Sequence, residues 1–371
     1  MSHDTAFRLT RRLAAGLFGA AAGAALVAGL AAPAAAQQES VKVGFVYVGP
    51  VSDHGWTYRH DVGRLAVEEA LGDQVETTFV ESVSEGADAE RVIRQLAQSG
   101  HDLIFTTSFG FMNPTVRVAE DFPDVRFEHA TGYKRADNVS TYAARFYEGR
   151  YVVGQIAGAM TESNIIGYIG AYPIPEVIRG INAFTLGLHS VNRDAEVRVI
   201  WANTWYDPGK ESDAARALID QGADVILQHT DSPAPIQAAE QAGVWAVGQA
   251  SDMQKFGPTA HLTAIVDNWD GYYIDRAQAI LDGTWESMDT WGGLDTGMVE
   301  IAPFNEAIPE EVVARALATE EAIMDGSLHP FTGPITNQAG EVVVPEGETV
   351  SDEDLLSMDY FIQGVQGTIP Q

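Results

Sequence analysis

Two tryptophans, a histidine and an aspartate stand just past apolar, strand-like runs, where these side-chain types could bind a flat ligand. Trp56 and Trp205 each follow a short apolar run, and His229 and Asp231 end and follow a third. In open α/β sheets, ligands bind outside the carboxyl ends of the strands. Two flat apolar rings at two such ends therefore predict a pocket that sandwiches a flat solute, while a carboxylate hydrogen-bonds its edge.

Each tryptophan also has a structural alternative, because tryptophan side chains in folded proteins are mostly buried. Trp201 and Trp205 lie on the same side of an extended chain, so at least one of them is expected in the core. Trp205 stands past the strand and directly before Tyr206-Asp207-Pro208, which ends extended structure and opens a helix. This position makes Trp205 the better ligand candidate of the two.

Asp231 has two alternative roles, as the N-cap of a helix that opens near Pro233 or as a ligand contact. Ser232 competes for the cap. A carboxylate suits amidine-like N–H donors, through charge-assisted hydrogen bonds of about 1.5–3 kcal/mol. Tyr47, near the end of the first strand, and Asn203 are further candidates, although Tyr47 could instead point into the core.

The elements that must position these residues alternate along the chain. Helical stretches separate β-branched runs, which predicts βαβ units and mainly parallel sheets. The segments AERVIRQLAQSGHDLIF (89–105) and ESDAARALIDQGADVIL (211–227) repeat one pattern, a helix closed by glycine and then a buried strand. This echo favours two similar lobes, although any βα unit shares that pattern. The predicted strands are 41–49, 75–82, 101–108, 125–131, 139–145, 165–171, 197–203, 223–230, 244–250, 261–267 and 296–302.

The predicted organisation has four parts. Residues 1–36 are a signal peptide, 37–145 plus 252–300 form one lobe, and 146–251 form the other. The last part, 301–371, is a helix followed by a tail that wraps around the lobes. The chain is expected to cross between lobes near 145, near 252 and near 300.

The N-terminal segment indicates export. Three arginines precede an apolar run over 13–32, and Ala34-Ala35-Ala36 supplies a small-residue cleavage site. A membrane anchor is the alternative, since the run approaches the length that spans a bilayer. The pair Arg11-Arg12 also fits a twin-arginine signal, which leaves the export route open. The chain has no cysteine, so we expect a periplasmic protein that is cleaved near Ala36 and carries no lipid anchor.

Composition excludes several functions. The formal net charge of −30 would repel phosphate backbones, so no nucleic-acid partner is expected. No GxxxxGK[ST], GxGxxG, GxSxG or HExxH motif is present, and no histidine pair has metal-ligand spacing. His54 and His60 flank Trp56 at a spacing that suits hydrogen bonding better than a metal. We therefore expect no enzyme, no metal and no cofactor, with a periplasmic hydrolase as the enzyme alternative.

Several segments resemble the basic membrane protein family, whose members are solute-binding components of ABC importers. The resemblance spans the chain after the signal segment and is closest to a branch that binds adenine and other purines. It implies the type I periplasmic binding protein fold, with two doubly wound parallel-sheet lobes, a hinge and a C-terminal extension. It also implies an inner-membrane ABC permease as partner. The matching segments are 42–49, 52–56, Asp207-Pro208-x-Lys210, 247–252 and 329–335.

Departures from the family's nucleoside-binding branch indicate a free base. Trp56 stands where that branch has a stacking phenylalanine, and Trp205 stands at its second aromatic ring. Ala250 replaces the aspartate that holds ribose hydroxyls, and Asp267 or Asn268 stands at the family's lysine position. The resemblance therefore implies a monomer that binds a purine base, adenine first. A purine nucleoside or another small solute is the alternative.

Overall fold

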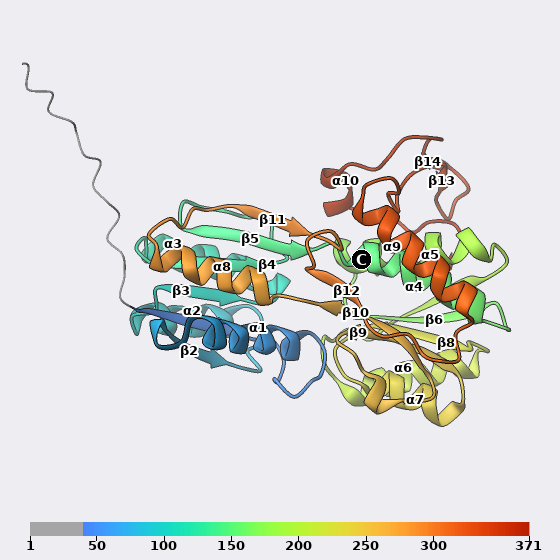
Figure 1. Cartoon of the computed structure of the whole chain (residues 1–371), viewed down its shortest axis with the longest axis horizontal. Helices are drawn as coiled ribbons and strands as arrows, with labels where there is room; N and C mark the ends of the chain where they lie inside the picture. The colour runs from blue at the N-terminus through green and yellow to red at the C-terminus, as the bar shows by residue number, and fades with distance from the viewer. Residues whose placement is uncertain (1–39, 371) are drawn as a thin grey trace, which may run out of the picture. The chain divides into compact units, whose positions relative to one another are not determined.

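The computed structural model describes residues 40–370, in which the strands form two mainly parallel sheets (Figure 1). The predicted signal peptide and its cleavage site lie outside the described residues. The first sheet is entirely parallel and has the order β11-β5-β4-β3-β1-β2. Its strands are β1 (Val41–Val46), β2 (Val75–Val80), β3 (Leu103–Thr106), β4 (Arg126–Ala130), β5 (Val139–Ala144) and β11 (Asp289–Gly292).

The second sheet has the order β12-β10-β9-β8-β6-β7-β15, and only β12 runs antiparallel to its neighbour. A separate antiparallel pair joins β13 (Ile335–Thr336) and β14 (Val342–Val344). The strands of the second sheet are β6 (Ile165–Gly170), β7 (Glu196–Trp201), β8 (Val225–His229), β9 (Trp245–Ala250), β10 (His261–Asp267), β12 (Val299–Ile301) and β15 (Val365–Gln366).

Helices cover both faces of each sheet because the central strands are apolar on both faces. Phe45 packs in the cluster that includes Tyr273 of α8, whereas the next residue, Val46, packs in the cluster beneath α2 and α3. Successive strand residues point to opposite faces, so each face needs its own helical layer. The first-sheet helices are α1 (Trp56–Leu71) with α8 (Asp270–Leu281), and α2 (Ala87–Gln98) with α3 (Met112–Asp121).

The second sheet is covered in the same way by two helix pairs, each packed together (Figure 1). Among the described residues, no helix is long and apolar enough to cross a membrane. The helices are α4 (Phe146–Met160) with α5 (Pro175–Val191), and α6 (Pro208–Asp220) with α7 (Ala234–Ala242). Short 3-10 turns occupy Gly72–Gln74, Phe109–Phe111 and Gln254–Phe256.

One segment of the chain belongs to a different half of the molecule from the one predicted. The prediction assigned 252–300 to the first lobe, but β10 pairs with β9 in the second sheet, as Ile265 opposite Gln249 shows. Of that segment only α8 and β11 return to the first half. In the structure the chain crosses between the halves near 145, at 268–269 and at 293–298. Strand pairing is a long-range property, which explains why local sequence patterns misplaced the second crossing.

The C-terminal part packs on the second half of the molecule, as the red segment of Figure 1 shows. Helix α9 (Glu310–Met324) packs on α4, α10 (Asp352–Leu356) packs on α5, and β15 extends the second sheet beside β7. Arg145 in the first crossover donates to both carboxylate oxygens of Asp352, at 2.8 and 2.7 Å. The tail is thereby tied to a segment that joins the two halves.

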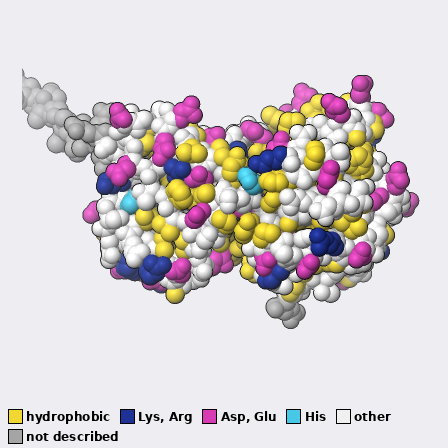
Figure 2. Space-filling view, turned by 90° about the horizontal axis from the view of Figure 1, so that it is seen from below, with side chains coloured by type: hydrophobic (Ala, Val, Ile, Leu, Met, Phe, Trp, Pro, Cys, Tyr) yellow, Lys and Arg dark blue, Asp and Glu magenta, His cyan; other side chains and the backbone are white. Residues whose placement is uncertain are grey.

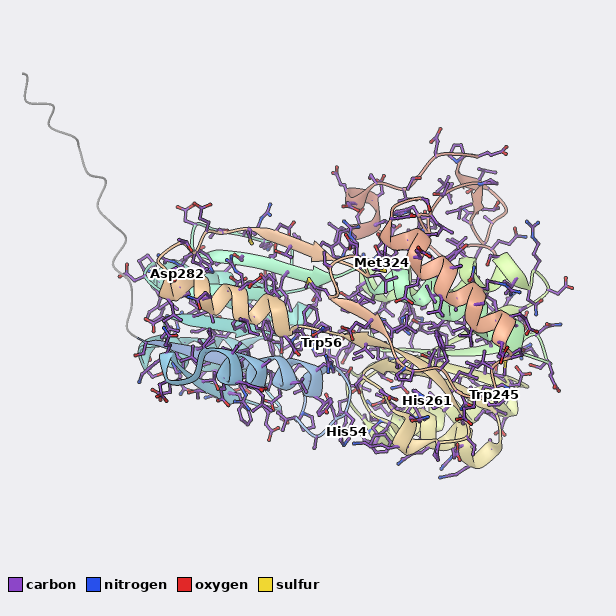
Figure 3. All side chains as sticks on the ribbon, in the orientation of Figure 1. His54, Trp56, Trp245, His261, Asp282 and Met324 are labelled. Carbon is purple, nitrogen blue, oxygen red and sulfur yellow. The ribbon has the colours of Figure 1, made fainter. Side chains whose placement is uncertain are left out.

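Charge and apolar surface are distributed as the composition predicts. On the face in Figure 2, acidic side chains are spread over both halves and basic side chains are fewer. Figure 3 places Trp56 and His54 where the two halves meet, whereas Trp245 and His261 lie within the second half. The two sheets thus meet at the region that the sequence marks for ligand binding.

Close packing of α4 against α5 predicts a sharp difference between two glycine substitutions. A Cβ at Gly187 would lie 2.0 Å from the carbonyl oxygen of Tyr151, whereas a Cβ at Gly271 of α8 meets nothing within 4 Å. Gly187→Ala should lower the free energy of unfolding by about 1–3 kcal/mol. Gly271→Ala should raise it by about 0.5–1 kcal/mol. Urea denaturation measures both, and equal midpoints would contradict this packing.

Candidate functional site

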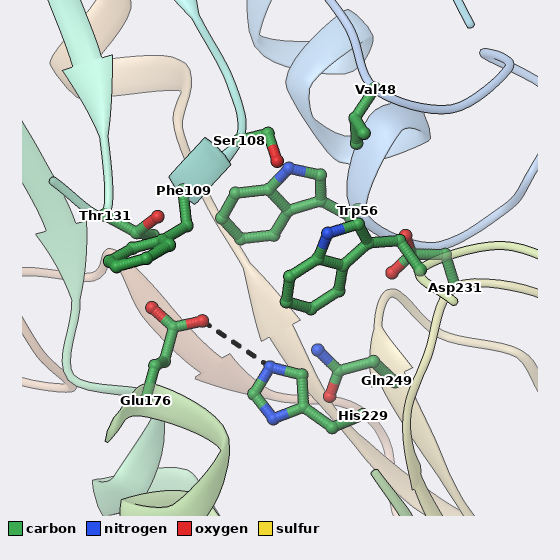
Figure 4. A pocket seen from close by; sticks show the side chains of 10 residues that line it. Val48, Trp56, Ser108, Phe109, Thr131, Glu176, His229, Asp231 and Gln249 are labelled. Atoms are coloured by element: carbon green, nitrogen blue, oxygen red, sulfur yellow. Dashed lines mark ion pairs between the residues drawn. The ribbon is translucent and has the colours of Figure 1, made fainter. Parts of the chain in front are cut away.

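A cavity lies between the carboxyl ends of the two sheets (Figure 4). Every residue of its lining belongs to a strand end or to the segment that follows a strand. The open-sheet rule therefore describes the site on both sides. The first half contributes Val48, Trp56, Ser108, Phe109 and Thr131, and the second contributes Glu176, Trp205, His229, Asp231 and Gln249.

Trp56 is fixed by hydrogen bonds at the start of α1. The buried carboxylate of Asp53 accepts three backbone N–H groups there, at 2.8–3.0 Å, and so orients the first helical turn. The indole nitrogen of Trp56 donates to the carbonyl oxygen of Thr107 at 2.6 Å. His60 and Trp269 contact the ring edge-on, with centroids 4.3 and 5.6 Å away. With its N–H already bonded, Trp56 offers the cavity an apolar ring held in one orientation.

The loops that carry Trp205 and Asp231 are joined to each other. The backbone N–H of Asp231 donates to the carbonyl oxygen of Trp205 at 2.9 Å. The buried carboxylate of Glu211 on α6 accepts from the backbone N–H of Asp207 at 2.8 Å and from that of Ser232 at 3.0 Å. Burial raises the pKa of Glu211. Glu211 therefore sets the relative position of the second ring and the carboxylate.

Asp231 presents a buried carboxylate oxygen to the cavity. Its Oδ2 atom has no hydrogen-bond partner among the described residues. Burial, followed by the negative charges of Asp53, Glu211 and Asp267, raises the pKa of Asp231 well above its ordinary value. The backbone N–H of Trp56 acts in the opposite direction and lowers it. Buried polar atoms are almost always bonded, so this oxygen is suited to accept from a ligand.

The alternative role of Asp231 as a helix cap is not observed. Helix α7 begins at Ala234, and the side chain of Ser232 accepts from the backbone N–H of Ala234 at 3.3 Å. The N-cap position of α7 is occupied by Pro233, so neither Asp231 nor Ser232 is the cap residue. Asp231 lines the cavity instead.

His229 and Glu176 form a polar pair on the opposite side of the cavity from Ser108 and Val48 (Figure 4). His229 Nε2 lies 3.5 Å from Glu176 Oε1. Burial lowers the pKa of His229, although the hydrogen bond to Glu176 raises it in part. The lowered pKa favours the neutral ring, whose Nε2 atom faces the Glu176 carboxylate.

Gln249 presents its amide group beside His229 (Figure 4). Its Oε1 atom accepts a hydrogen bond from the buried guanidinium of Arg150, which also donates to the carbonyl oxygen of Gln228 at 3.0 Å. Since the amide oxygen is already bonded, the NH₂ group of Gln249 is the part left for a ligand. The cavity thus combines hydrogen-bond acceptors on one wall with a donor on another.

The two halves touch at the rim of the cavity. A Cβ at Gly55 would lie 2.4 Å from the carbonyl oxygen of Asp231, so the two loops meet backbone to backbone. The hydroxyl of Ser251 donates to the carbonyl oxygen of His54. On another side, Trp205 Nε1 lies 3.4 Å from a carboxylate oxygen of Glu85. Contacts between the halves therefore enclose the cavity.

Four of the six predicted site residues line this one cavity: Trp56, Trp205, His229 and Asp231. Tyr47 does not, since it is fully buried and donates its hydroxyl to Asp61 at 3.3 Å. Asn203 is exposed, and its amide lies 3.4 Å from the carbonyl oxygen of Trp201. The roles of all six toward a ligand stay predictions, and Tyr47 and Asn203 have no place in the cavity described here.

The prediction did not include the other lining residues, although the rule that ligands bind at the carboxyl ends of strands applies to them too. Ser108 and Phe109 follow β3, Thr131 follows β4, and Glu176 lies just after β6. Applying the strand-end rule to every strand would have found them. Glu176 was hidden by the abundance of acidic residues, which makes any one carboxylate uninformative. Within residues 40–370, no three His, Cys, Asp or Glu side chains are placed to hold a metal ion.

Comparisons with known proteins agree with this architecture. A family model described as Bmp, ABC transporter substrate-binding protein PnrA-like, matches residues 40–329. A purine-binding protein of Brucella abortus (strain 2308) is 58% identical over 338 residues, which cover 91% of this chain and 96% of that protein. A Haloferax volcanii protein whose name assigns it to glucose binding in an ABC transporter is 42% identical, over 90% of this chain and 82% of that protein.

Solved structures show the same fold. A solute-binding protein of an ABC transporter from Conexibacter woesei has a TM-score of 0.64 at 25% identity, covering 78% of this chain and 98% of that one. One from Aeropyrum pernix K1 has a TM-score of 0.69 at 18% identity, covering 85% of this chain and 95% of that one. The predicted fold, a type I periplasmic binding protein with two doubly wound parallel sheets, is confirmed.

The protonation state of His229 gives a test of the site itself. We expect ¹⁵N NMR at pH 6.5 to show a neutral ring with its proton on Nε2, because burial lowers the pKa and Glu176 accepts from that nitrogen. Glu176→Gln should weaken this tautomer preference, and His229→Gln assigns the signal. Because the folded pKa lies below the unfolded one, His229 should cost stability as pH falls below about 6.5. A cationic His229 at pH 6.5 would contradict the described pair.

Proposed function

We propose that this chain, which belongs to the Bmp family of ABC transporter substrate-binding proteins, binds a purine base in the cavity between its two sheets. Adenine is the preferred ligand in this proposal. The observation that carries it is the convergence of two indole rings and one unpartnered carboxylate on a single cavity. The substrate-binding role follows from the family, whereas the purine and its contacts are inferred from the cavity.

The lining of the cavity favours a flat aromatic solute. Trp56 comes from the first half and Trp205 from the second, so a base between them would stack on both. Stacking of a base on an aromatic side chain contributes about 1–3 kcal/mol. Each face of such a ligand would contact a tryptophan from a different half, so the bound ligand would hold the two halves together.

The free carboxylate oxygen favours adenine among flat solutes. Adenine carries an exocyclic amine next to ring nitrogens, and its N–H groups can donate to Asp231 Oδ2. A donor at that position stabilises the ionised carboxylate, which the surrounding negative charges disfavour. The Gln249 amide can donate in turn to a ring nitrogen, which is an acceptor. Each N–H bond to the ionised carboxylate is worth about 1.5–3 kcal/mol.

The lining favours a base over its nucleoside. Ala250, which stands where the nucleoside-binding branch resembled by this sequence has a ribose-binding aspartate, is fully buried and does not line the cavity. Asp267, at the family's lysine position, is likewise buried and lies outside the lining. A ribose would therefore meet no carboxylate from that strand end. The name of the Brucella abortus relative supports a purine, whereas that of the Haloferax volcanii relative makes glucose the competitor to test.

In this proposal the protein acts outside the cytoplasmic membrane and delivers its ligand to an ABC permease as a monomer. The export pattern of residues 1–36 supports that location. Closure of the two halves around the ligand, about the crossovers near 145, 268–269 and 293–298, would present the loaded form to the permease. Capture and release need no bond to be broken, so the proposal assigns no reaction to the protein.

Calorimetry on the protein without residues 1–36 tests the ligand. Adenine should bind with a dissociation constant between micromolar and nanomolar, at least tenfold tighter than adenosine, and glucose should not bind. The reason is that the cavity stacks and hydrogen-bonds a base but offers ribose no partner. Equal or tighter binding of adenosine would reject the free base. Binding of glucose alone would reject the purine.

Two substitutions test the contacts. Trp205→Ala and Asp231→Asn should each weaken adenine binding at least tenfold, through lost stacking and lost charge. His54→Ala and Asp252→Asn, both outside the lining, should change it less than twofold. Because the pKa of Asp231 is raised, adenine affinity should increase with pH until the carboxylate is ionised, and Asp231→Asn should abolish that dependence. A tenfold effect of the control substitutions would argue against this site.

A further inference from the structure

A second and larger hollow lies next to the cavity. It shares Phe109, Thr131 and Glu176 with the cavity lining. We call it the tail groove, because Glu353, Leu356 and Ser357 of the C-terminal part line it opposite residues of the two halves. The shared residues place the tail groove directly beside the cavity.

The tail groove is mainly apolar, and part of its surface is open to solvent. Ile174 and Pro175 line it at the start of α5, and Trp291 lines it from β11. At its rim, Tyr133 is 66% exposed and Leu356 is 44% exposed. Scattered exposed apolar residues are ordinary, but apolar side chains that gather beside a ligand cavity mark a binding surface. These side chains would bury most apolar surface by covering a group that is attached to the ligand in the cavity.

The tail forms a fixed wall of this groove. Besides the Arg145–Asp352 pair, buried Arg179 donates to the carbonyl oxygen of Leu355 at 2.7 Å. The guanidinium of Arg179 also lies over the ring of Trp291, 5.0 Å from its centroid. The family match ends at residue 329, so this wall lies beyond the part that the family model describes.

We propose that the tail groove holds an apolar substituent of the ligand, so that the protein takes purine bases with an alkyl or aryl group attached. This inference rests on the proposed function, because the base must occupy the cavity. Charge favours an uncharged substituent over a phosphate, since Glu176, Asp289 and Glu353 all line the groove. Arg179, its basic residue, already bonds the tail.

Calorimetry with a matched series of purines tests the inference. The series is adenine, N6-benzyladenine, N6-hexyladenine and 9-benzyladenine, which places the apolar group on either side of the base. At least one substituted purine should bind about tenfold tighter than adenine, because the groove buries its apolar surface. Leu356→Asp should weaken that purine at least tenfold and change adenine less than twofold.

Leu317→Asp is the matched control, because Leu317 is 51% exposed on α9 and lies outside the groove. This control should change neither the affinity for adenine nor that for the substituted purine. Thermal melting should show that Leu356→Asp and Leu317→Asp are both folded. If adenine binds but every substituted purine binds tenfold more weakly, the tail groove inference is overturned while the proposed function stands. If a substituted purine binds tightly and Leu356→Asp leaves its affinity unchanged, the tail groove inference is overturned as well. If no purine in the series binds, the proposed function itself fails.

Discussion

The site depends on the backbone contact between Gly55 and Asp231. Only a residue without a Cβ lets the loop before α1 approach the loop after β8 this closely. The contact brings an indole from one sheet against the loop that carries a carboxylate and an indole from the other. Asp53 accepts backbone N–H groups at the start of α1. Glu211 accepts backbone N–H groups from the loops that follow β7 and β8. Two buried acids thus shape a cavity that neither sheet forms alone.

Much of this arrangement could be predicted from local sequence, because strand ends in a parallel sheet share one edge. That rule predicts that Trp56, Trp205, His229 and Asp231 lie together, and all four line the cavity. It also selected Tyr47, whose side chain points into the core instead, where it packs against Phe45. The rule gives the layer in which a side chain lies but not the face to which it points.

Long-range features lay beyond the sequence pattern. β10 has the length and composition of any buried strand, and only its pairing with β9 assigns it to the second sheet. The tail was expected to wrap around the lobes, but its anchors at Arg145 and Arg179 depend on residues more than a hundred positions away. Contacts of that range are set by tertiary packing, which leaves no local periodicity to read.

The crowding of acids around Asp231 has a thermodynamic consequence for a protein that binds and releases. A carboxylate whose pKa is raised by burial and by three neighbouring negative charges holds a proton more readily than one in water. A ligand that donates N–H groups to the same oxygen then competes with that proton. By linkage, a ligand that binds only the ionised form of Asp231 would displace a proton wherever this group is protonated. The affinity for such a ligand would then depend on the local pH as well as on the ligand concentration.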